Sequence, residues 1–248
     1  MIAAADSAGV LMMTAYRLHS EPATAKVIEM IQAGEIGEPR VYSSSFSLQS
    51  DPDNHRLLAA HWGGPLQDIG IYCLNAARHC FGAEPIEAHA VVSGGNGDIR
   101  FAEVDATIAV TLRFPGDRLA QFVASFEADD CDTYRVVGTE GVLTVEHGFD
   151  FHFSPQVWLM KGQTAREIEV EDTDQFGAMT TYFSDCIQSG TRPVNDGEEG
   201  LADVRALLAI EKAARTGVPQ AIDTPPRPAH PSGNTVRIVP RTERRLVF

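Results

Sequence analysis

Apolar residues recur at three- and four-residue spacing in five segments of the chain, which is the pattern of a helix with one buried face. These segments are residues 2–8, 21–33, 66–80, 176–187 and 201–215. The third has the clearest ends. Gly64 and Pro65 suit the N-cap and the first helical position, and Gly82 suits the left-handed position after the last turn. We therefore predict one well-delimited helix here.

Between residues 85 and 170 apolar and polar positions alternate, which is the period of a strand with one buried face. The strands expected in this region are residues 86–92, 104–114, 119–126, 134–137, 142–146, 157–160 and 167–170. Outside it, residues 41–48 form another expected strand, and residues 10–14 and 235–239 have weaker strand character. Consecutive strands without helices between them indicate an antiparallel meander. We predict an α+β fold, with a mostly antiparallel open sheet of about six or more strands and helices packed on one face.

The other face of this sheet keeps apolar positions. Depending on register, it carries Phe122 or Val123 and Ile108 or Ala109. A large open apolar face usually marks an interface. We therefore expect a homodimer formed through the open sheet face.

A second stripe on the helix at 66–80 is polar. Asp68, Tyr72, Asn75 and His79 follow one another at spacings of four, three and four, so they share one line. Asp68 lies near the helix start, where the helix dipole favours its ionised form. A carboxylate one turn before a phenol is a candidate pair for proton transfer. The alternative is a half-buried core tyrosine whose hydroxyl is satisfied by Asp68.

The composition is that of an ordinary globular protein, with 44% hydrophobic and 22% charged residues. A net charge of −14 argues against nucleic acid as a partner, because phosphate binding needs a basic surface. The four cysteines form no Cys-x-x-Cys pair, which is typical of free thiols in a reducing compartment. No segment resembles a signal peptide or is apolar enough to span a membrane. We predict a cytoplasmic location.

Residues 223–248 differ from the rest of the chain. They contain five arginines and two acidic residues, a net charge of +3, together with a cluster of prolines. This composition is typical of an extended segment. We therefore divide the chain into a domain at residues 1–222 and a Pro/Arg-rich extended tail at residues 223–248.

Two common kinds of site are not indicated. Gly95-Asn96-Gly97 lacks the third glycine of the dinucleotide fingerprint and leads into a strand rather than a helix. The histidines have no metal-ligand spacing, so we predict no metal site. The first helical pattern begins at residue 2 with no N-cap before it, as in a helix cut in the middle.

Four segments resemble the C-terminal domain of the glucose–fructose oxidoreductase/inositol dehydrogenase (Gfo/Idh/MocA) family. They are residues 15–22 (AYRLHSEP), 31–37 (IQAGEIG), 63–72 (GGPLQDIGIY) and 197–217 (GEEG through AARTG). The resemblance covers about residues 1–222. Tyr72 stands where many members have histidine. A tyrosine at this position resembles the branch of glucose–fructose oxidoreductase and the dihydrodiol or xylose dehydrogenases.

The resemblance implies an NAD(P)-dependent oxidoreductase that transfers a hydride to or from a sugar or polyol. Carried over by position, the site residues are Tyr72 and Asp68 for catalysis, Arg17, His19 and Asn75 for the substrate, and Tyr16 and Arg17 for the cofactor. Tyr72 would be the general acid/base, and Asp68 would orient it and tune its proton affinity.

The family's glycine-rich loop and its Glu-Lys-Pro lysine have no counterpart in this sequence. The resemblance therefore implies that NADP or NAD is bound mainly by a domain absent from this chain. Without that lysine, we expect Tyr72 to be a neutral phenol hydrogen-bonded near Asp68. Two alternatives remain open: a non-catalytic sugar-binding or dimerisation module that keeps the fold without the cofactor, and a fragment of a longer product.

Overall fold

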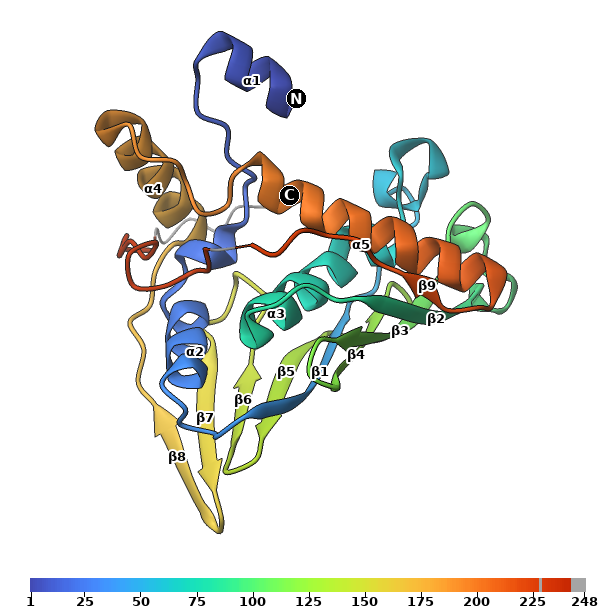
Figure 1. Cartoon of the computed structure of the whole chain (residues 1–248). Coiled ribbons are helices and arrows are strands. Elements are labelled where there is room, and N and C mark those ends of the chain that lie inside the picture. Colours follow the sequence, from blue (N-terminus) through green and yellow to red (C-terminus); the bar gives the residue numbers. More distant parts are fainter. Residues whose placement is uncertain (228, 242–248) are drawn as a thin grey trace.

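One large sheet forms the centre of the computed structural model (Figure 1), which describes residues 1–227 and 229–241. Within these residues the chain forms nine strands, in the spatial order β8-β7-β6-β5-β1-β4-β3-β2-β9. Their bounds are β1 Pro39–Ser47, β2 Glu87–Ser93, β3 Thr107–Phe114, β4 Arg118–Ser125, β5 Cys131–Gly138, β6 Val142–Glu146, β7 Gln156–Lys161, β8 Thr164–Ile168 and β9 Gln220–Ala221. The predicted mostly antiparallel sheet is confirmed, with more strands than the minimum expected.

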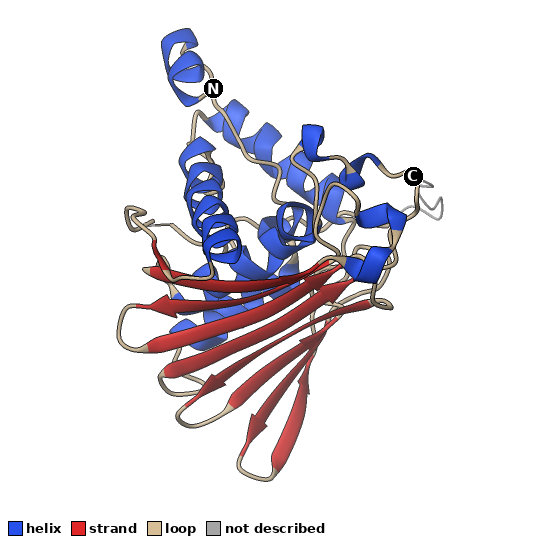
Figure 2. Ribbon diagram, turned by 90° about the vertical axis from the view of Figure 1, so that its right-hand side faces the viewer, coloured by secondary structure: helices blue, strands red, loops and turns tan. Residues whose placement is uncertain are grey.

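The described residues also form five α-helices: α1 Ile2–Ala8, α2 Pro22–Gln32, α3 Ile71–Phe81, α4 Gln175–Ser189 and α5 Gly197–Thr216. Helices α2, α3 and α5 contact the sheet at β7, β1 and β2, and Figure 2 views these layers from the side. Helix α1 has no buried residue and projects from the rest of the molecule. Among the described helices, none combines the length and the apolar character needed to cross a membrane.

Strand β1 lies in the middle of the sheet, away from its neighbours in sequence. It pairs in parallel with β4, where Ser45 faces Val123, and antiparallel with β5, where Ser45 faces Thr133. The remaining pairs are antiparallel. The predicted meander is therefore interrupted once, by a strand that comes from the segment before α3.

Alternating burial identifies the two faces of the sheet. Phe122 and Ile108 are buried in the core, whereas Val123 is 40% exposed on the opposite face and Ala109 is its cross-strand neighbour there. These assignments resolve the register alternatives of the sequence. The open face thus carries small apolar and hydroxyl-bearing side chains, together with the polar side chains of Gln121 and Arg135.

The predicted central helix forms with a widened first turn. A π-helical turn spans Leu66–Gly70 and continues directly into α3, which ends at Phe81 before Gly82 in the left-handed conformation (φ 56°). A Cβ atom at Gly70 would lie 3.3 Å from the ring of Phe122, so glycine allows this turn to approach β4 closely. Asp68 lies in the wide turn, and such turns are frequent at functional sites.

The C-terminal segment that follows β9 folds back over the domain. The Nδ1 atoms of His230 and His79 are 2.9 Å apart, and Thr235 Oγ1 donates a hydrogen bond to the carbonyl oxygen of His19. The strand expected at 235–239 does not form, because this segment is held by side-chain contacts rather than by a neighbouring strand. The predicted tail is thus extended but attached; residue 228 and residues 242–248 lie outside the described part.

The prediction of a strand at residues 10–14 is also wrong, because this segment does not join the sheet. Its only described pairing is an isolated bridge between Met13 and Asp196, at the start of α5. A short apolar run has the composition of a strand but needs a neighbouring edge to become one. This segment instead connects α1 to the body.

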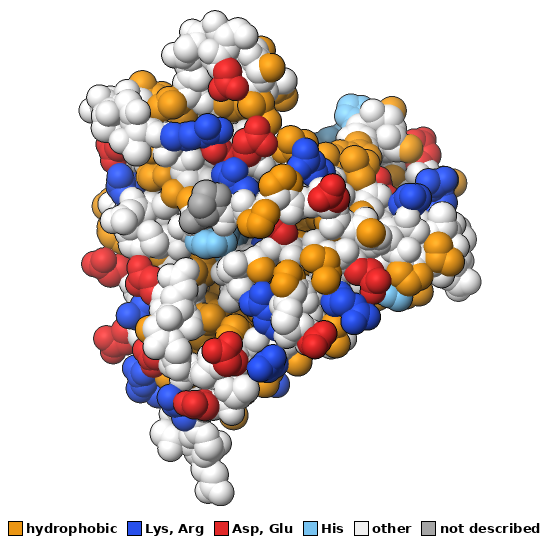
Figure 3. Space-filling model, viewed as in Figure 1, with side chains coloured by type: hydrophobic (Ala, Val, Ile, Leu, Met, Phe, Trp, Pro, Cys, Tyr) orange, Lys and Arg blue, Asp and Glu red, His pale blue; other side chains and the backbone are white. Residues whose placement is uncertain are grey.

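Charges of both signs are interspersed over the helical side of the molecule (Figure 3). The acidic excess of the composition is therefore not gathered into one patch on the face in view. Apolar residues are scattered between the charges, as they are on protein surfaces in general.

Gly138 offers a test of the packing at the end of β5. A Cβ atom there would lie 2.1 Å from the backbone oxygen of Ile36, and this backbone cannot move without shifting the chain end of α2. We expect Gly138→Ala to lower the free energy of unfolding in urea by about 1–3 kcal/mol, the usual cost of overpacking. Gly94→Ala is the control, because a Cβ at Gly94 meets nothing within 4 Å. Equal stability of the two variants would contradict the close approach.

Candidate functional site

A partly open pocket of about 200 Å³ lies between the turn at Arg17–Ser20, helix α3 and the loop after β6. We call it the site cavity. It is lined by Ala15, Tyr16, Arg17, Leu18, His19, Thr24, Ile28, Asp68, Ile71, Tyr72, Asn75, Ala76, His79, Cys80, Tyr134, Gly148 and Phe149. Every residue that the sequence nominated for catalysis, substrate or cofactor is in this list. The polar stripe of α3 thus forms one wall, as its helical spacing predicted.

Tyr72 is half-buried among aromatic rings. Its ring meets Phe46 edge-on at a centroid distance of 5.6 Å and lies 6.3 Å from Phe149. The guanidinium carbon of Arg17 lies 4.9 Å from the Tyr72 ring centroid. In the described part of the chain no hydrogen bond joins Tyr72 to Asp68, so the expected contact between them is not formed.

Asp68 is instead bound by Arg56, whose Nε donates to its Oδ1 at 2.8 Å. Burial raises the pKa of Asp68, and the charges of Arg56 and His55 oppose that rise. The sequence analysis missed Arg56, because it lies in a single 3₁₀ turn, His55–Leu57, which is too short to show a period. The carboxylate keeps its second oxygen available to the cavity.

Arg17 is almost fully buried and bonds only to uncharged groups. Its guanidinium donates to the carbonyl oxygens of Phe149 and Asp150, the latter at 3.3 Å, and to the side-chain oxygen of Gln175. Its face also stacks over aromatic rings. The two terminal guanidinium nitrogens are therefore bonded within the protein itself.

His19 and Asn75 act as a pair. The Nε2 atom of His19 lies 2.8 Å from Asn75 Oδ1, which assigns the proton to Nε2, while Nδ1 is buried and has no hydrogen-bond partner among the described residues. Asn75 Nδ2 donates to Asp203 at 2.8 Å. Burial and the neighbouring His79 lower the pKa of His19 to about 3, so its ring is neutral near pH 7. Its free lone pair can accept a hydrogen bond.

Tyr16 lines the site cavity, but its hydroxyl is bonded within the protein. Its hydroxyl donates to Asp203 Oδ2 at 2.6 Å. Burial, reinforced by the Asp203 carboxylate, raises the pKa of Tyr16 far above its ordinary value. This phenol is therefore a structural donor, and contact with a cofactor could involve only its ring.

A buried ion network lies directly behind the cavity. Arg78 of α3 binds Glu84 at 2.6 Å, Glu199 at 2.7 Å and Asp203 at 2.6 Å. Burial would lower the pKa of Arg78, but these carboxylates raise it well above its ordinary value. One feature of the sequence could have indicated this network. Glu199 and Asp203 lie four positions apart and so on one side of α5, the side that is buried.

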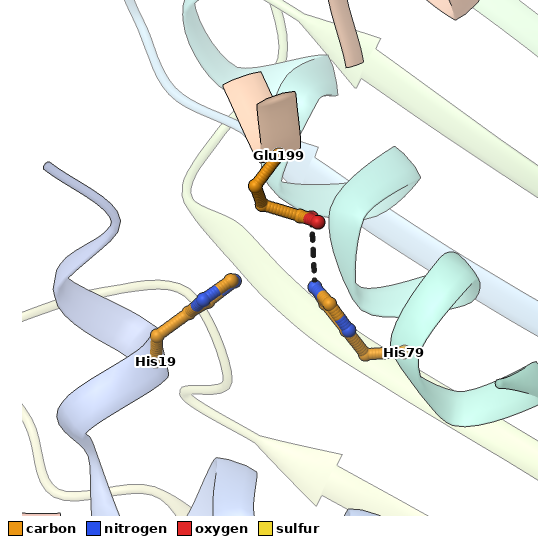
Figure 4. A group of neighbouring side chains, drawn as sticks. All are labelled: His19, His79 and Glu199. Carbon is orange, nitrogen blue, oxygen red and sulfur yellow. Dashed lines mark hydrogen bonds and ion pairs between the residues drawn. The ribbon is translucent and has the colours of Figure 1, made fainter. Parts of the chain in front are cut away.

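His19, His79 and Glu199 form a group whose potential ligand atoms lie within 4.8 Å of one another (Figure 4). In Figure 4 the two imidazoles and the carboxylate come from the Arg17–Ser20 turn, α3 and α5. Glu199 Oε1 already accepts from Arg78 and from His79 Nε2 at 3.1 Å. A divalent ion here would face the buried charge of Arg78, which repels it. The group is better described as part of the ion network, and the absence of a metal site stays a prediction.

Comparison with known proteins gives consistent matches. Residues 24–144 match the model of the GFO/IDH/MocA C-terminal domain. D-xylose 1-dehydrogenase [NADP(+)] of Haloarcula marismortui is 34% identical over 223 residues, which are 87% of this chain and 61% of that protein. Trans-1,2-dihydrobenzene-1,2-diol dehydrogenase of Bos taurus is 30% identical over 234 residues, covering 89% of this chain and 67% of the relative.

A solved structure is similar over the same region. The aldose-aldose oxidoreductase of Caulobacter crescentus, complexed with glycerol, superposes with a TM-score of 0.85 at 33% identity, covering 89% of this chain and 67% of that one. The chain thus spans about two thirds of the length of these proteins. By fold and by sequence, this chain belongs to the GFO/IDH/MocA family.

Proposed function

We propose that this chain is the substrate-binding and oligomerisation part of an NAD(P)-dependent oxidoreductase that transfers a hydride to or from a sugar or polyol. The observation that carries the proposal is the position of Tyr72 and Asp68, a phenol and a carboxylate one turn apart on the wall of the site cavity. A phenol so placed can exchange a proton with a substrate hydroxyl. The names of the similar xylose dehydrogenase and aldose-aldose oxidoreductase agree with a sugar substrate.

In this proposal Tyr72 is the general acid/base, which assigns the chain to the tyrosine-bearing branch of the family. Asp68 acts as an acceptor for a neighbouring substrate hydroxyl, and its ion pair with Arg56 holds the carboxylate in place. This role replaces the expected direct orientation of Tyr72 by Asp68, since no hydrogen bond between them is found in the described residues.

The remaining groups suit a neutral polyol. His19 Nδ1 offers a buried acceptor, whereas both ends of the Asn75 amide are used by His19 and Asp203. Asn75 is therefore assigned to positioning His19 rather than to direct contact. The rings of Tyr72 and Phe149 supply an apolar wall for the C–H face of a sugar.

The cofactor is assigned to residues outside this chain. The dinucleotide phosphates need a glycine-rich turn at a helix N-terminus or free cations. In the described residues the Tyr16 hydroxyl is bound to Asp203 and the Arg17 nitrogens to backbone and amide oxygens, so neither is free for a phosphate. When bound, the nicotinamide supplies the hydride chemistry; this chain supplies the proton-transferring group and the substrate wall.

The open face of the sheet is assigned to self-association. On it lie Val91 (70% exposed), Val123 and Leu119, with serine and threonine side chains between them. Burying these valine and leucine side chains against a second copy would remove them from water, provided that polar neighbours such as Gln121 and Arg135 find partners across the interface.

Our first functional prediction concerns Tyr72 in the chain joined to a family cofactor domain with the glycine-rich loop and Glu-Lys-Pro. Tyr72→Phe should lower the turnover number with sugar substrates by roughly 100- to 10,000-fold, the range for a lost general acid/base. Tyr182→Phe on α4, away from the cavity, is the matched control and should keep full turnover. Normal turnover of Tyr72→Phe with loss in Asp68→Asn would transfer the role to Asp68, and normal turnover of both would favour the non-catalytic module.

The second concerns the cofactor. Calorimetric titration of this chain alone with NAD and with NADP should give no binding tighter than about millimolar, which corresponds to roughly −4 kcal/mol. The same chain joined to the cofactor domain is the positive control. Micromolar binding by the chain alone would mean that it contains a phosphate site which we have not identified.

The third concerns the sheet face. Light scattering at micromolar concentration should give a dimer for the wild type and a monomer for Val123→Lys, because the lysine places a charge in the interface. Leu208→Lys, at a position on α5 that is 52% exposed, should leave the dimer intact. A wild-type monomer, or equal effects of the two lysines, would refute the assignment.

A further inference from the structure

Arg17 is a buried cation without a carboxylate partner. Only 6% of the residue is exposed, and within residues 1–227 and 229–241 no ion pair involves it. Its hydrogen-bond acceptors are two backbone carbonyls and the amide oxygen of Gln175. Arginine stays protonated in proteins, so a full positive charge is present in this dry region.

The guanidinium carbon of Arg17 lies over three aromatic rings. This carbon is 4.9 Å from the centroid of Tyr72, 5.3 Å from that of Phe151 and 5.9 Å from that of Phe176. Carbonyl dipoles and aromatic faces stabilise a cation in part, but they do not neutralise it. Of the three rings, only that of Tyr72 can acquire a negative charge.

We propose that Arg17 is the counter-ion of the Tyr72 phenolate, the form that accepts the substrate proton. This inference rests on the proposed function, which assigns the acid/base role to Tyr72. When the phenol gives its O–H proton to the substrate, the electron pair stays on its oxygen, and the negative charge forms beside a cation that has no other anion. In the reverse direction the phenolate takes the proton from the substrate hydroxyl, its negative charge is neutralised, and Arg17 is again a cation without an anion.

The other groups around Tyr72 do not provide this charge. On α3 and the turn before it, Asp68 is bound to Arg56 and His79 to Glu199. On the Arg17–Ser20 turn, burial lowers the pKa of His19 to about 3 and so keeps it neutral. Arg17 is thus the cation that faces the ring.

The elements on the far side of the ring carry acidic groups that are already bonded. On β5, Asp132 Oδ2 accepts from the backbone N–H groups of Phe149 and Asp150, while His147 lies 3.3 Å from its other oxygen. Asp150 Oδ1 accepts from the backbone N–H of its neighbour. Burial raises the pKa of Tyr134, so it is neutral as well.

The chain contains a natural contrast to this arrangement. Arg237 also lies over a tyrosine ring, that of Tyr182, at 5.5 Å, but its Nε is paired with Asp185 at 2.6 Å. A guanidinium with a carboxylate partner has little charge left for the ring beneath it. Arg237 therefore serves as the matched control for Arg17.

The test is an ultraviolet absorbance titration of phenolate formation in this chain, which needs no cofactor. The difference between wild type and Tyr72→Phe isolates Tyr72. The absorbance change of Tyr72 can be told apart from that of the other tyrosines, because burial raises the pKa of Tyr16, Tyr42, Tyr134 and Tyr182.

Two substitutions alter the charge on Arg17 in different ways. Arg17→Gln removes the positive charge, so Tyr72 should ionise only at higher pH. The proton concentration at which half of Tyr72 is ionised should fall by about 10- to 1000-fold, the usual effect of losing a nearby opposite charge. Gln175→Glu keeps Arg17 in place but gives it a carboxylate of nearly the same shape as the amide. It should shift the titration in the same direction by a smaller factor, at the cost of the hydrogen bond from Gln175 Nε2 to the Asp150 carbonyl. Arg237→Gln should leave it unchanged.

An unchanged Tyr72 titration in Gln175→Glu would overturn the proposal even if Arg17→Gln does not fold, because a purely structural arginine would tolerate the added carboxylate without affecting the phenol. An equal shift in Arg237→Gln would also overturn it, since the effect would then be unspecific. The proposed function fails separately, through unaltered turnover of Tyr72→Phe in the protein joined to a cofactor domain.

Discussion

The ion network of Arg78 is the contact on which the site depends. It joins α3 to the first turns of α5 through Glu199 and Asp203, which lie 121 and 125 residues further along the chain. A buried guanidinium is tolerated only when its donors are satisfied, and removal of one partner from such a network costs about 3–5 kcal/mol. The network therefore fixes the relative position of two helices that the sheet alone would leave free to slide.

This fixed contact extends to the wall of the site cavity. Asp203 accepts hydrogen bonds from Tyr16 and Asn75 on its second oxygen, and Asn75 in turn holds His19. The polar groups behind the cavity are thus oriented by one buried cluster of charges. Preorganisation of this kind lets a site bind a neutral, hydroxyl-rich ligand without first reorienting its own dipoles.

The two buried arginines illustrate two uses of the same side chain. Arg78 is surrounded by carboxylates and has a structural role. Arg17 is surrounded by carbonyls and aromatic rings, and its charge stays uncompensated in the resting protein. Uncompensated buried charge is costly, and our proposal places this one beside a phenol that becomes negative when it gives up its proton.

Local chemistry in the sequence determined the elements and one wall of the site. Glycine and proline defined the ends of the central helix, alternation defined the strands of the sheet, and the spacing of Asp68, Tyr72 and Asn75 placed them together, because helical and strand periods are set by neighbours along the chain. Only the tertiary structure decided which distant groups meet. The parallel pairing of β1 with β4, the pairing of Asp68 with Arg56 and the carboxylate partners of Arg78 join segments through space. No local period records them, because they are selected by the burial of charge and apolar surface in the whole fold.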